Sequence, residues 1–160
     1  MSEFSDLGVS ARLNEALSNR DIDAPFPIQT LVIPDALAGK DVLAKSRTGS
    51  GKTLAFAVPM VQNIDPQEKG PVALVLTPTR ELAVQVAEEF RWLGESKRIR
   101  VAAVYGGVAL EKQASRANKA HVIVATPGRL EDIESRGLVS LKNVRILVLD
   151  EADRMLDIGF

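Results

Sequence analysis

Residues 46–53 (SRTGSGKT) have the types and spacing of a loop that binds a polyphosphate. Gly49 and Gly51 allow the backbone to point its N–H groups at the phosphates, because glycine accepts backbone angles that other residues avoid. Lys52 would place a cation at the β- and γ-phosphates, and the hydroxyl of Thr53 is a ligand for Mg²⁺. The alternative is a glycine- and serine-rich turn with a chance lysine. It is disfavoured because an apolar segment lies on each side of the loop.

Two adjacent acidic residues form a second candidate site. Asp150 and Glu151 directly follow the apolar residues 146–149 (ILVL). If that segment is a buried strand, Asp150 lies at the carboxyl end of the sheet, where ligands of open α/β sheets bind. A carboxylate there can hold Mg²⁺, and Glu151, which points elsewhere, can take a proton from an attacking water. The alternative is an acidic helix cap after a core strand, which the phosphate-binding loop in the same chain makes a weaker interpretation.

Short apolar runs must position these groups. They are rich in Val, Ile and Leu and mostly lack strict alternation, which is typical of parallel strands buried on both faces. The predicted strands are residues 41–45, 72–77, 101–105, 121–125 and 144–150.

Amphipathic segments between these runs predict helices. Ser10 can cap a helix that carries Leu13 and Leu17, and Pro27 can begin another that ends at Gly39. Further helices are predicted over residues 52–64, after Pro78 with Leu82, Val86, Phe90 and Leu93 inward, and from Thr126-Pro127 to Gly137 with Leu130 and Ile133 inward. The alternation of strand and helix predicts an α/β fold with a doubly wound, mostly parallel sheet flanked by helices.

Composition narrows the function classes. The 160 residues suit a single domain, and 20 basic against 21 acidic residues give a net charge of −1. This excludes a disordered polyelectrolyte and a broad basic surface that holds nucleic acid by charge alone. Without cysteine and with one histidine, His121, the chain has neither a disulfide framework nor a thiolate or histidine zinc site, and we interpret His121 as structural. No apolar run is long enough to span a membrane and the start lacks a secretion signal, so we expect a cytoplasmic protein.

The tetrad Asp150-Glu151-Ala152-Asp153, together with TGSGKT at 48–53, resembles the DEAD-box ATP-dependent RNA helicases. Further stretches match the family's motifs in order along the whole chain. They are Phe4, 25 residues before Gln29; PFPIQ at 25–29, like the Q motif; PTRELA at 78–83, like motif Ia; the doublet Gly106-Gly107; TPGR at 126–129, like motif Ib; and residues 154–160.

The resemblance implies a first RecA-like domain of a longer helicase, with residues 1–39 as the Q-motif region and 40–160 as the phosphate-loop-to-DEAD core. It implies ATP and Mg²⁺ as cofactors and RNA, bound without sequence preference, as a partner. The family's motif III and second RecA-like domain, which carries an arginine finger, do not occur in these 160 residues. We therefore expect the domain to be incomplete at its C-terminal end, with two sheet edges unpaired, and to be nearly inactive alone.

The resemblance also assigns roles to individual residues. Gln29 would read the adenine edge and Phe4 would lie against the adenine face, unless Phe4 is simply a core contact. Ile22 would make an aliphatic adenine contact where Phe or Tyr is common. The catalytic residues would be Lys52, Asp150 and Glu151, with Thr53 and Asp150 holding Mg²⁺ partly through water. The nucleotide-binding set is Phe4, Ile22, Gln29, Ser46, Arg47, Thr48, Gly49, Ser50, Gly51, Lys52 and Thr53, and the RNA-binding set is Pro78, Thr79, Arg80, Gly106, Gly107, Thr126, Pro127, Gly128 and Arg129.

Two further positions depart from the family pattern. Ser46 replaces the usual Ala or Gly, and Phe26 replaces a common Ser or Thr, which removes a hydroxyl that would tie the Q motif to the phosphate loop.

Two other function classes stay open. One is an enzyme of another phosphate-loop class, such as a nucleotide kinase or transporter ATPase, although the lid or signature sequence that it would need is not found. The other is a non-enzymatic RNA-binding fragment, which an ATP titration would distinguish.

Overall fold

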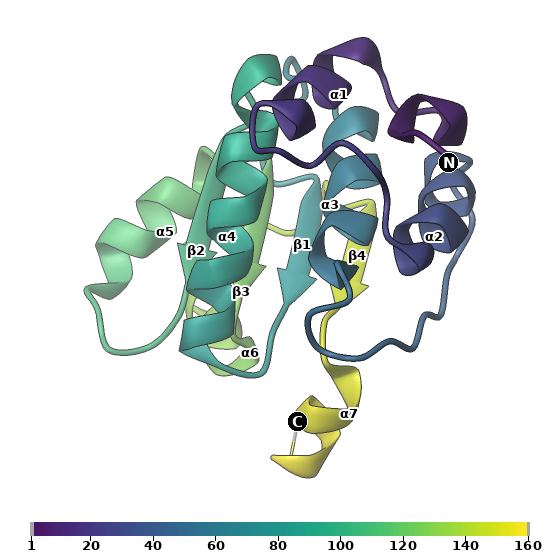
Figure 1. Cartoon of the computed structure of the whole chain (residues 1–160). Helices are drawn as coiled ribbons and strands as arrows, with labels where there is room; N and C mark the ends of the chain where they lie inside the picture. The colour runs from purple at the N-terminus through teal and green to yellow at the C-terminus, as the bar shows by residue number, and fades with distance from the viewer. Residues whose placement is uncertain (1, 160) are drawn as a thin grey trace.

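A four-stranded parallel sheet forms the centre of the protein, whose computed structural model describes residues 2–159 (Figure 1). The strand order is β2-β3-β1-β4, and β1 pairs in register with both β3 and β4. The strands are β1 (Ala73–Leu76), β2 (Val101–Val104), β3 (Val122–Ala125) and β4 (Ile146–Leu149). Four of the five predicted strands are thereby confirmed.

Helices cover both faces of the sheet. α3 and α4 lie on one face with α1 and α2 packed against them, and α5 and α6 lie on the other (Figure 1). The helices are η1 (Phe4–Leu7), α1 (Ala11–Ser18), α2 (Pro27–Leu37), α3 (Lys52–Asn63), α4 (Arg80–Gly94), η2 (Glu95–Lys97), α5 (Leu110–Asn118), α6 (Pro127–Ser135) and α7 (Ala152–Asp157). This arrangement confirms the predicted α/β class.

Local sequence explains most helix boundaries. The Ser10 hydroxyl accepts from the N–H of Leu13 and begins α1, and the Thr79 hydroxyl accepts from the N–H of Leu82 and begins α4. Pro27 begins α2, since its missing N–H costs nothing in the first helical turn. The sequence did not predict α5, because its buried face is made of Gln113, Ala114 and Ala117 rather than large apolar residues.

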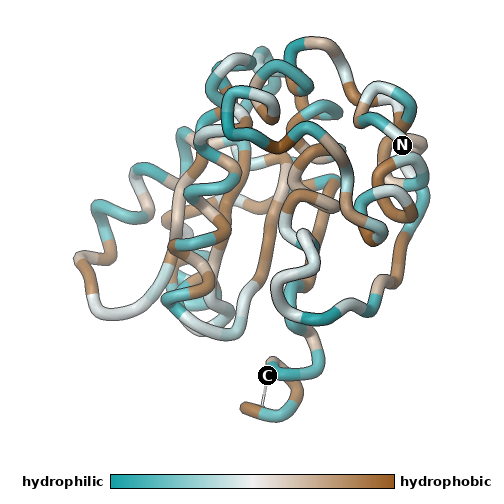
Figure 2. Tube along the Cα trace, viewed as in Figure 1, coloured by the Kyte–Doolittle hydropathy of each residue, from teal (hydrophilic) through white to brown (hydrophobic). Residues whose placement is uncertain are grey.

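The predicted strand over residues 41–45 is wrong. Residues 40–47 form no regular structure, and the Leu43 side chain is fully exposed. A strand needs a neighbour for its backbone hydrogen bonds, and within residues 2–159 no strand pairs with this segment. Figure 2 shows the resulting hydrophobic stretch on the outside of the molecule, between α2 and the phosphate loop. β4 is likewise an edge strand, with Leu147 and Leu149 exposed on one of its faces.

Candidate functional site

The phosphate loop, residues 46–53, leads directly into α3. Gly49 and Gly51 both have φ of +81°, a left-handed conformation that favours glycine. Gly51 is also crowded, because a Cβ there would lie 2.5 Å from both the Gln29 side-chain nitrogen and the Phe26 ring. The loop therefore needs glycine at this position for its backbone angle and for its close packing. Lys52 and Thr53 follow at the positive end of the α3 dipole, which favours an anion.

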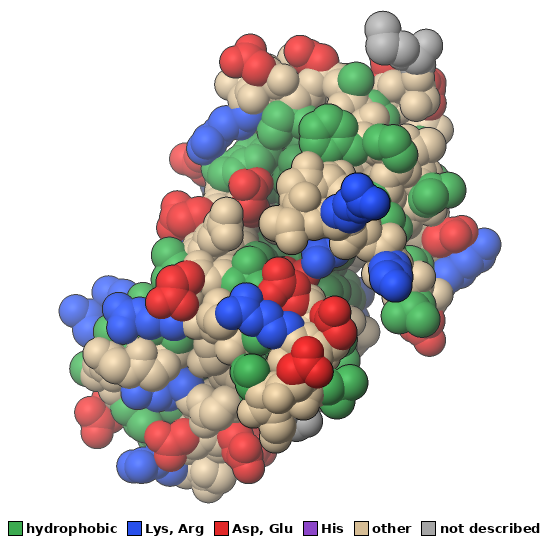
Figure 3. All heavy atoms as spheres, turned by 60° about the horizontal axis from the view of Figure 1, so that its bottom comes forward, with side chains coloured by type: hydrophobic (Ala, Val, Ile, Leu, Met, Phe, Trp, Pro, Cys, Tyr) green, Lys and Arg blue, Asp and Glu red, His purple; other side chains and the backbone are tan. Residues whose placement is uncertain are grey.

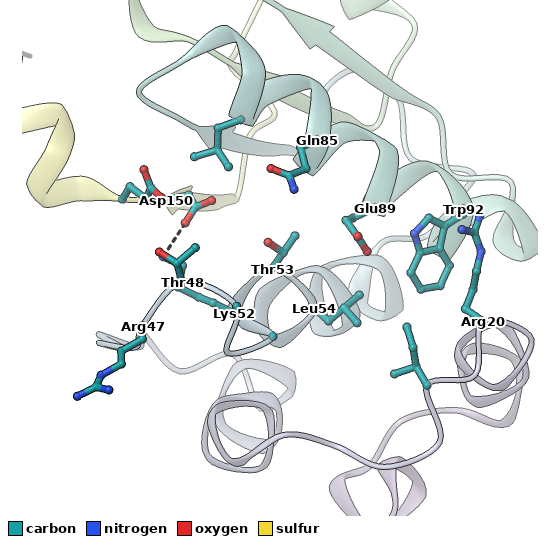
Figure 4. Close-up of a pocket in the computed structure, with 15 residues that line it drawn as sticks. Arg20, Arg47, Thr48, Lys52, Thr53, Leu54, Gln85, Glu89, Trp92 and Asp150 are labelled. Carbon is teal, nitrogen blue, oxygen red and sulfur yellow. Dashed lines mark ion pairs between the residues drawn. The ribbon is translucent and has the colours of Figure 1, made fainter.

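Lys52 and Asp150 face each other across the base of this loop. The Lys52 Nζ lies 3.3 Å from Asp150 Oδ1, and Figure 4 draws this ion pair as a dashed line. Burial raises the pKa of the Asp150 carboxyl, and the Lys52 charge opposes that rise. Asp150 is only 4 % exposed, and its Oδ1 has no hydrogen-bond partner among the residues that the structure describes. A buried carboxylate oxygen with only a cation near it fits a site for a divalent ion.

A Mg²⁺ site at this position would be completed by ligands from outside the protein. Within residues 2–159 no group of three or more His, Cys, Asp and Glu side chains could hold a metal ion. Thr53 and Asp150 line the same cleft and supply a hydroxyl and a carboxylate oxygen. Mg²⁺ is commonly held by one or two carboxylates together with water and substrate phosphates, so the residues present fit this ion.

Glu151 adopts a backbone conformation that is uncommon for its type. Its φ of 52° and ψ of 50° are left-handed, and it is the residue that precedes α7. Such angles cost about 1–3 kcal/mol and often occur at functional sites. Glu151 lines the same cleft as Asp150 and Lys52, with its side chain near Arg154 at 3.5 Å.

A cleft of about 430 Å³ runs from these residues along α4. At its far end Arg20 lies over the Trp92 ring, 4.8 Å from the ring centroid (Figure 4), and Ile22 also lines the cleft. Gln85, Glu89 and Trp92 line the wall that α4 contributes, and sequence reasoning missed them. Their spacing of four and three residues places them on one helix stripe, which could have identified them.

Gln29 ties the start of α2 to the phosphate loop. Its side-chain oxygen accepts from the N–H of Phe26 at 2.8 Å, and its side-chain nitrogen donates to the Gly51 carbonyl at 2.9 Å. The side chain is 2 % exposed and does not line the cleft. Position 26 has no hydroxyl to tie this region to the phosphate loop, and the Gln29 side chain makes that connection. Its adenine-reading role stays a prediction.

Phe4 lies in the protein core, and its contact with adenine stays a prediction. Phe4 is 2 % exposed and belongs to the core that includes Val9, Leu13 and Ile33. Because η1 folds back onto α2, the ring is covered on the protein side and does not reach the cleft. The alternative interpretation, a core contact, describes Phe4 in this structure. Ile22, in contrast, does line the cleft.

The residues predicted to contact RNA gather at the carboxyl ends of β1, β2 and β3. Arg80 begins α4, and its guanidinium lies 5.0 Å from the centroid of the Tyr105 ring. Gly107 has φ of +89°, and a Cβ there would lie 3.0 Å from Arg80 Nη1. Pro78 and Thr79 precede Arg80, and Gly106 precedes Gly107, so the β1–α4 and β2–α5 loops lie side by side.

Arg129 connects the third loop to the second. Its Nη1 donates to the Val108 carbonyl at 2.9 Å and to Gln113 Oε1 at 3.1 Å. Thr126 is the residue that caps α6, with Pro127 and Gly128 in the first turn. Two arginines and the N-terminal turns of α4 and α6 therefore share one edge of the sheet.

Comparison with known proteins identifies the family. The DEAD/DEAH box helicase family model matches residues 26–160. The chain belongs to the DEAD/DEAH box helicase family. It is 50% identical, over 98% of its length, to "ATP-dependent RNA helicase DBP8" of Yarrowia lipolytica, and 44% identical over 100% to "DEAD-box ATP-dependent RNA helicase CshA" of Geobacillus kaustophilus. It spans 37% and 34% of those two proteins, about a third of their length.

Solved structures of helicase-family proteins have the same fold. A DEAD box protein from Methanococcus jannaschii superposes with a TM-score of 0.94 at 42% identity, over 98% of this chain and 43% of the other. A hypothetical ATP-dependent RNA helicase from Sulfolobus tokodaii gives 0.86 at 40% identity, over 93% of this chain and 43% of the other. The parallel sheet is therefore that of a RecA-like helicase domain. Within the described residues, no helix has the length and apolar character needed to cross a bilayer.

Proposed function

We propose that this chain is the ATP- and RNA-binding first RecA-like domain of an ATP-dependent RNA helicase. The observation that supports this most directly is the arrangement at the carboxyl edge of the sheet. There the phosphate loop and Asp150 lie beside one cleft, and the loops that carry Arg80, Gly107 and Arg129 lie next to one another. The membership of the DEAD/DEAH box helicase family and the names of the relatives agree with both ligands.

Nucleotide binding would replace Asp150 by a phosphate as the ion-pair partner of Lys52. Its ammonium now neutralises Asp150, and a bound β- or γ-phosphate would take over that ammonium. Asp150 and the Thr53 hydroxyl would then hold Mg²⁺, which neutralises charge on the phosphate oxygens. Gln29 holds the loop in place through the Gly51 carbonyl, and Ile22 offers an aliphatic contact to the base. Glu151 would accept the proton of the attacking water.

RNA binding would depend on a few well-placed groups, since the chain has a net charge of −1. Arg80 and Arg129 supply two cations, and the starts of α4 and α6 supply backbone N–H donors for phosphates. Phosphate contacts carry no base information, so binding is expected to tolerate any sequence and to depend weakly on salt. Duplex unwinding and RNA-stimulated hydrolysis would require a second RecA-like domain.

Two titrations test the proposal. Calorimetry should show Mg–ADP binding to the wild type and none to Lys52→Ala, because Lys52 is the cation of the loop that faces the phosphates; Lys69→Ala, an exposed lysine far from the loop, is the control. Anisotropy with labelled oligouridine should show weaker binding for Arg80→Ala and Arg129→Ala. RNA binding without ADP binding would support the non-enzymatic alternative, and a preference for guanine nucleotides or a steep salt slope would contradict the assignment.

A further inference from the structure

A second hollow lies on the opposite side of α4 from the nucleotide cleft. It has a volume of about 300 Å³ and lies along the free edge of β2, between α4 and α5. We call it the edge groove. Its floor contains Val101, Ala103 and Tyr105, and its rim carries Arg91, Lys112 and Arg116. None of these six residues belongs to the nucleotide or RNA site proposed above, although the Tyr105 ring contacts Arg80 of the RNA site.

The strand at the floor has backbone groups available for pairing. The Arg100 carbonyl accepts from Val122 of β3, and the Val104 carbonyl accepts from Thr126, the residue after β3. Even-numbered residues of β2 therefore direct their backbone polar groups toward β3. In a parallel ladder successive residues alternate, and Val101 and Ala103 therefore direct their N–H and C=O groups outward. The N–H of Tyr105 is taken by Gln113 Oε1 at 3.3 Å. The groove thus presents two donor and acceptor pairs at the spacing of a β-strand.

The rim of the groove is basic. Arg91 comes from α4, and Lys112 and Arg116 are one helix turn apart on α5. Arg91 forms an ion pair with Glu88, whereas Lys112 and Arg116 have no ion-pair partner among residues 2–159. No Asp or Glu of the described chain lines the groove. Figure 3 shows several basic side chains, with acidic ones among them, at the left, the side on which α5 lies in Figure 1.

We propose that the edge groove binds an extended acidic peptide segment of a protein partner, which adds to the sheet beside β2. Strand addition uses main-chain hydrogen bonds for affinity and neighbouring side chains for selectivity. Here the outward N–H and C=O groups of Val101 and Ala103 pair with the peptide backbone, and Lys112 and Arg116 select acidic side chains. The same cations oppose pairing with basic strands, which agrees with the use of charge to protect sheet edges.

Two observations favour a peptide over an RNA strand in this groove. The phosphate groups of RNA are acceptors only and cannot pair with the outward carbonyls of Val101 and Ala103, whereas a peptide backbone offers an N–H and a C=O together at each pairing position. The Tyr105 ring, which could otherwise stack on a base, already has the guanidinium of Arg80 over its face. The proposal is independent of ATP and RNA binding, and its test requires neither ligand.

The test uses the full 160-residue chain and a fluorescein-labelled peptide, (Glu-Val)₄, with (Lys-Val)₄ as the charge-reversed probe. Anisotropy should detect binding of the acidic peptide only. In ¹⁵N-resolved NMR spectra the largest amide shifts should fall at Val101 and Ala103. The double variant Lys112→Glu with Arg116→Glu should weaken binding about tenfold or more, because two attractions become repulsions.

A matched control makes the same change of charge elsewhere. Lys69→Glu with Lys142→Glu alters two exposed lysines outside the groove and should leave binding within about twofold. Equal losses in both double variants would show non-specific attraction and overturn the proposal. Absence of shifts at Val101 and Ala103 in the wild type would overturn it as well, whether or not the variants fold. Displacement of the peptide by oligouridine, with shifts at the same amides, would assign the groove to RNA instead.

Discussion

The Gln29 side-chain nitrogen donates to the carbonyl oxygen of Gly51 at 2.9 Å, and so connects the first turn of α2 to the start of α3. The Gln29 side chain is almost fully buried, and both ends of its amide are engaged. A residue that the family resemblance assigns to base recognition therefore also shapes the loop that would hold the phosphates. Loss of this side chain should act on stability and on nucleotide binding together.

We expect Gln29→Ala to lower the free energy of unfolding by about 1–3 kcal/mol, since it leaves the partly buried N–H of Phe26 and C=O of Gly51 without partners. Urea unfolding measures this loss, and Thr30→Ala, one residue along the same helix, is the control. Calorimetry should show that the variant binds ADP and GDP more weakly, with the larger loss for ADP. Equal losses would mean that Gln29 supports the loop without reading adenine.

Gly49 and Gly51 provide a matched pair of substitutions. Both have φ of +81°, so alanine at either position carries a left-handed penalty of about 1–2 kcal/mol. A Cβ at Gly49 would meet nothing within 4 Å, whereas one at Gly51 would collide with Gln29 and Phe26. Overpacking adds roughly 1–3 kcal/mol, so Gly51→Ala should unfold at lower urea than Gly49→Ala. Similar midpoints for the two variants would contradict the crowding.

Asp150 should reduce the stability of the nucleotide-free protein at neutral pH. Burial holds its folded-state pKa above the ordinary value, so the folded state binds this proton more readily than the unfolded state. The associated stabilisation is present in acid and is lost as pH rises through the folded-state pKa. Asp150→Asn should therefore unfold at higher urea than the wild type at pH 7, with a smaller difference near pH 4, while the exposed Asp153→Asn changes little. If Asp150→Asn is instead less stable than the wild type at pH 7, the ion pair with Lys52 stabilises the protein by more than burial of the Asp150 carboxylate costs.

His121 should make the protein less stable in weak acid. Its Nδ1 accepts from the N–H of Arg100 at 3.0 Å and its Nε2 donates to the Pro66 carbonyl at 3.0 Å, which fixes the neutral ring. Burial lowers the pKa of this imidazole. The unfolded state then binds the proton first, and stability falls as pH drops below about 6.5. Urea midpoints at pH 7.5, 6.5 and 5.5 measure the fall. Since His121 is the sole histidine of the chain, His121→Gln should lack it.

The 160-residue chain alone should show almost no RNA-stimulated ATP hydrolysis. In the proposed site Lys52, Asp150 and Glu151 would supply the loop cation, the Mg²⁺ carboxylate and the base, but phosphoryl transfer also needs a cation on the γ-phosphate oxygens. An arginine finger contributes a factor of roughly 10³ to 10⁵ in rate, or about 4–7 kcal/mol of barrier. Steady-state phosphate release measures the rate, with a second-domain protein added as the positive control. Turnover of roughly 1 s⁻¹ by the chain alone, as in ordinary kinases, would contradict this prediction. Substitution of Arg47, Arg80 and Arg129 in turn would then identify the arginine that replaces the finger.

Local sequence was sufficient to predict the central strands and most of the helices. The runs rich in Val, Ile and Leu became β1 to β4. Ser10, proposed as a cap, does cap α1, and Pro27, proposed as a helix start, does begin α2. Residues 41–45 have a similar composition but no strand beside them, and strand formation depends on a distant partner that composition does not reveal.

The candidate site was predicted where a motif is contiguous and missed where it depends on packing. The phosphate loop and the Asp150-Glu151 pair lie beside one cleft, whereas Gln85, Glu89 and Trp92 enter it through the orientation of α4. For Phe4, a match to the family pattern did not predict how the side chain packs. Its position relative to Gln29 matches the family pattern, but the fold of η1 decides that its ring faces the core.

The two edges of the sheet differ in how they would meet other molecules. Cations of α4 and α5 flank the β2 edge, whereas the β4 edge carries the exposed Leu147 and Leu149. An unpaired edge with an apolar face is a template for aggregation. Self-association that rises with concentration would therefore begin at β4, and the solubility of the chain depends on what shields that side.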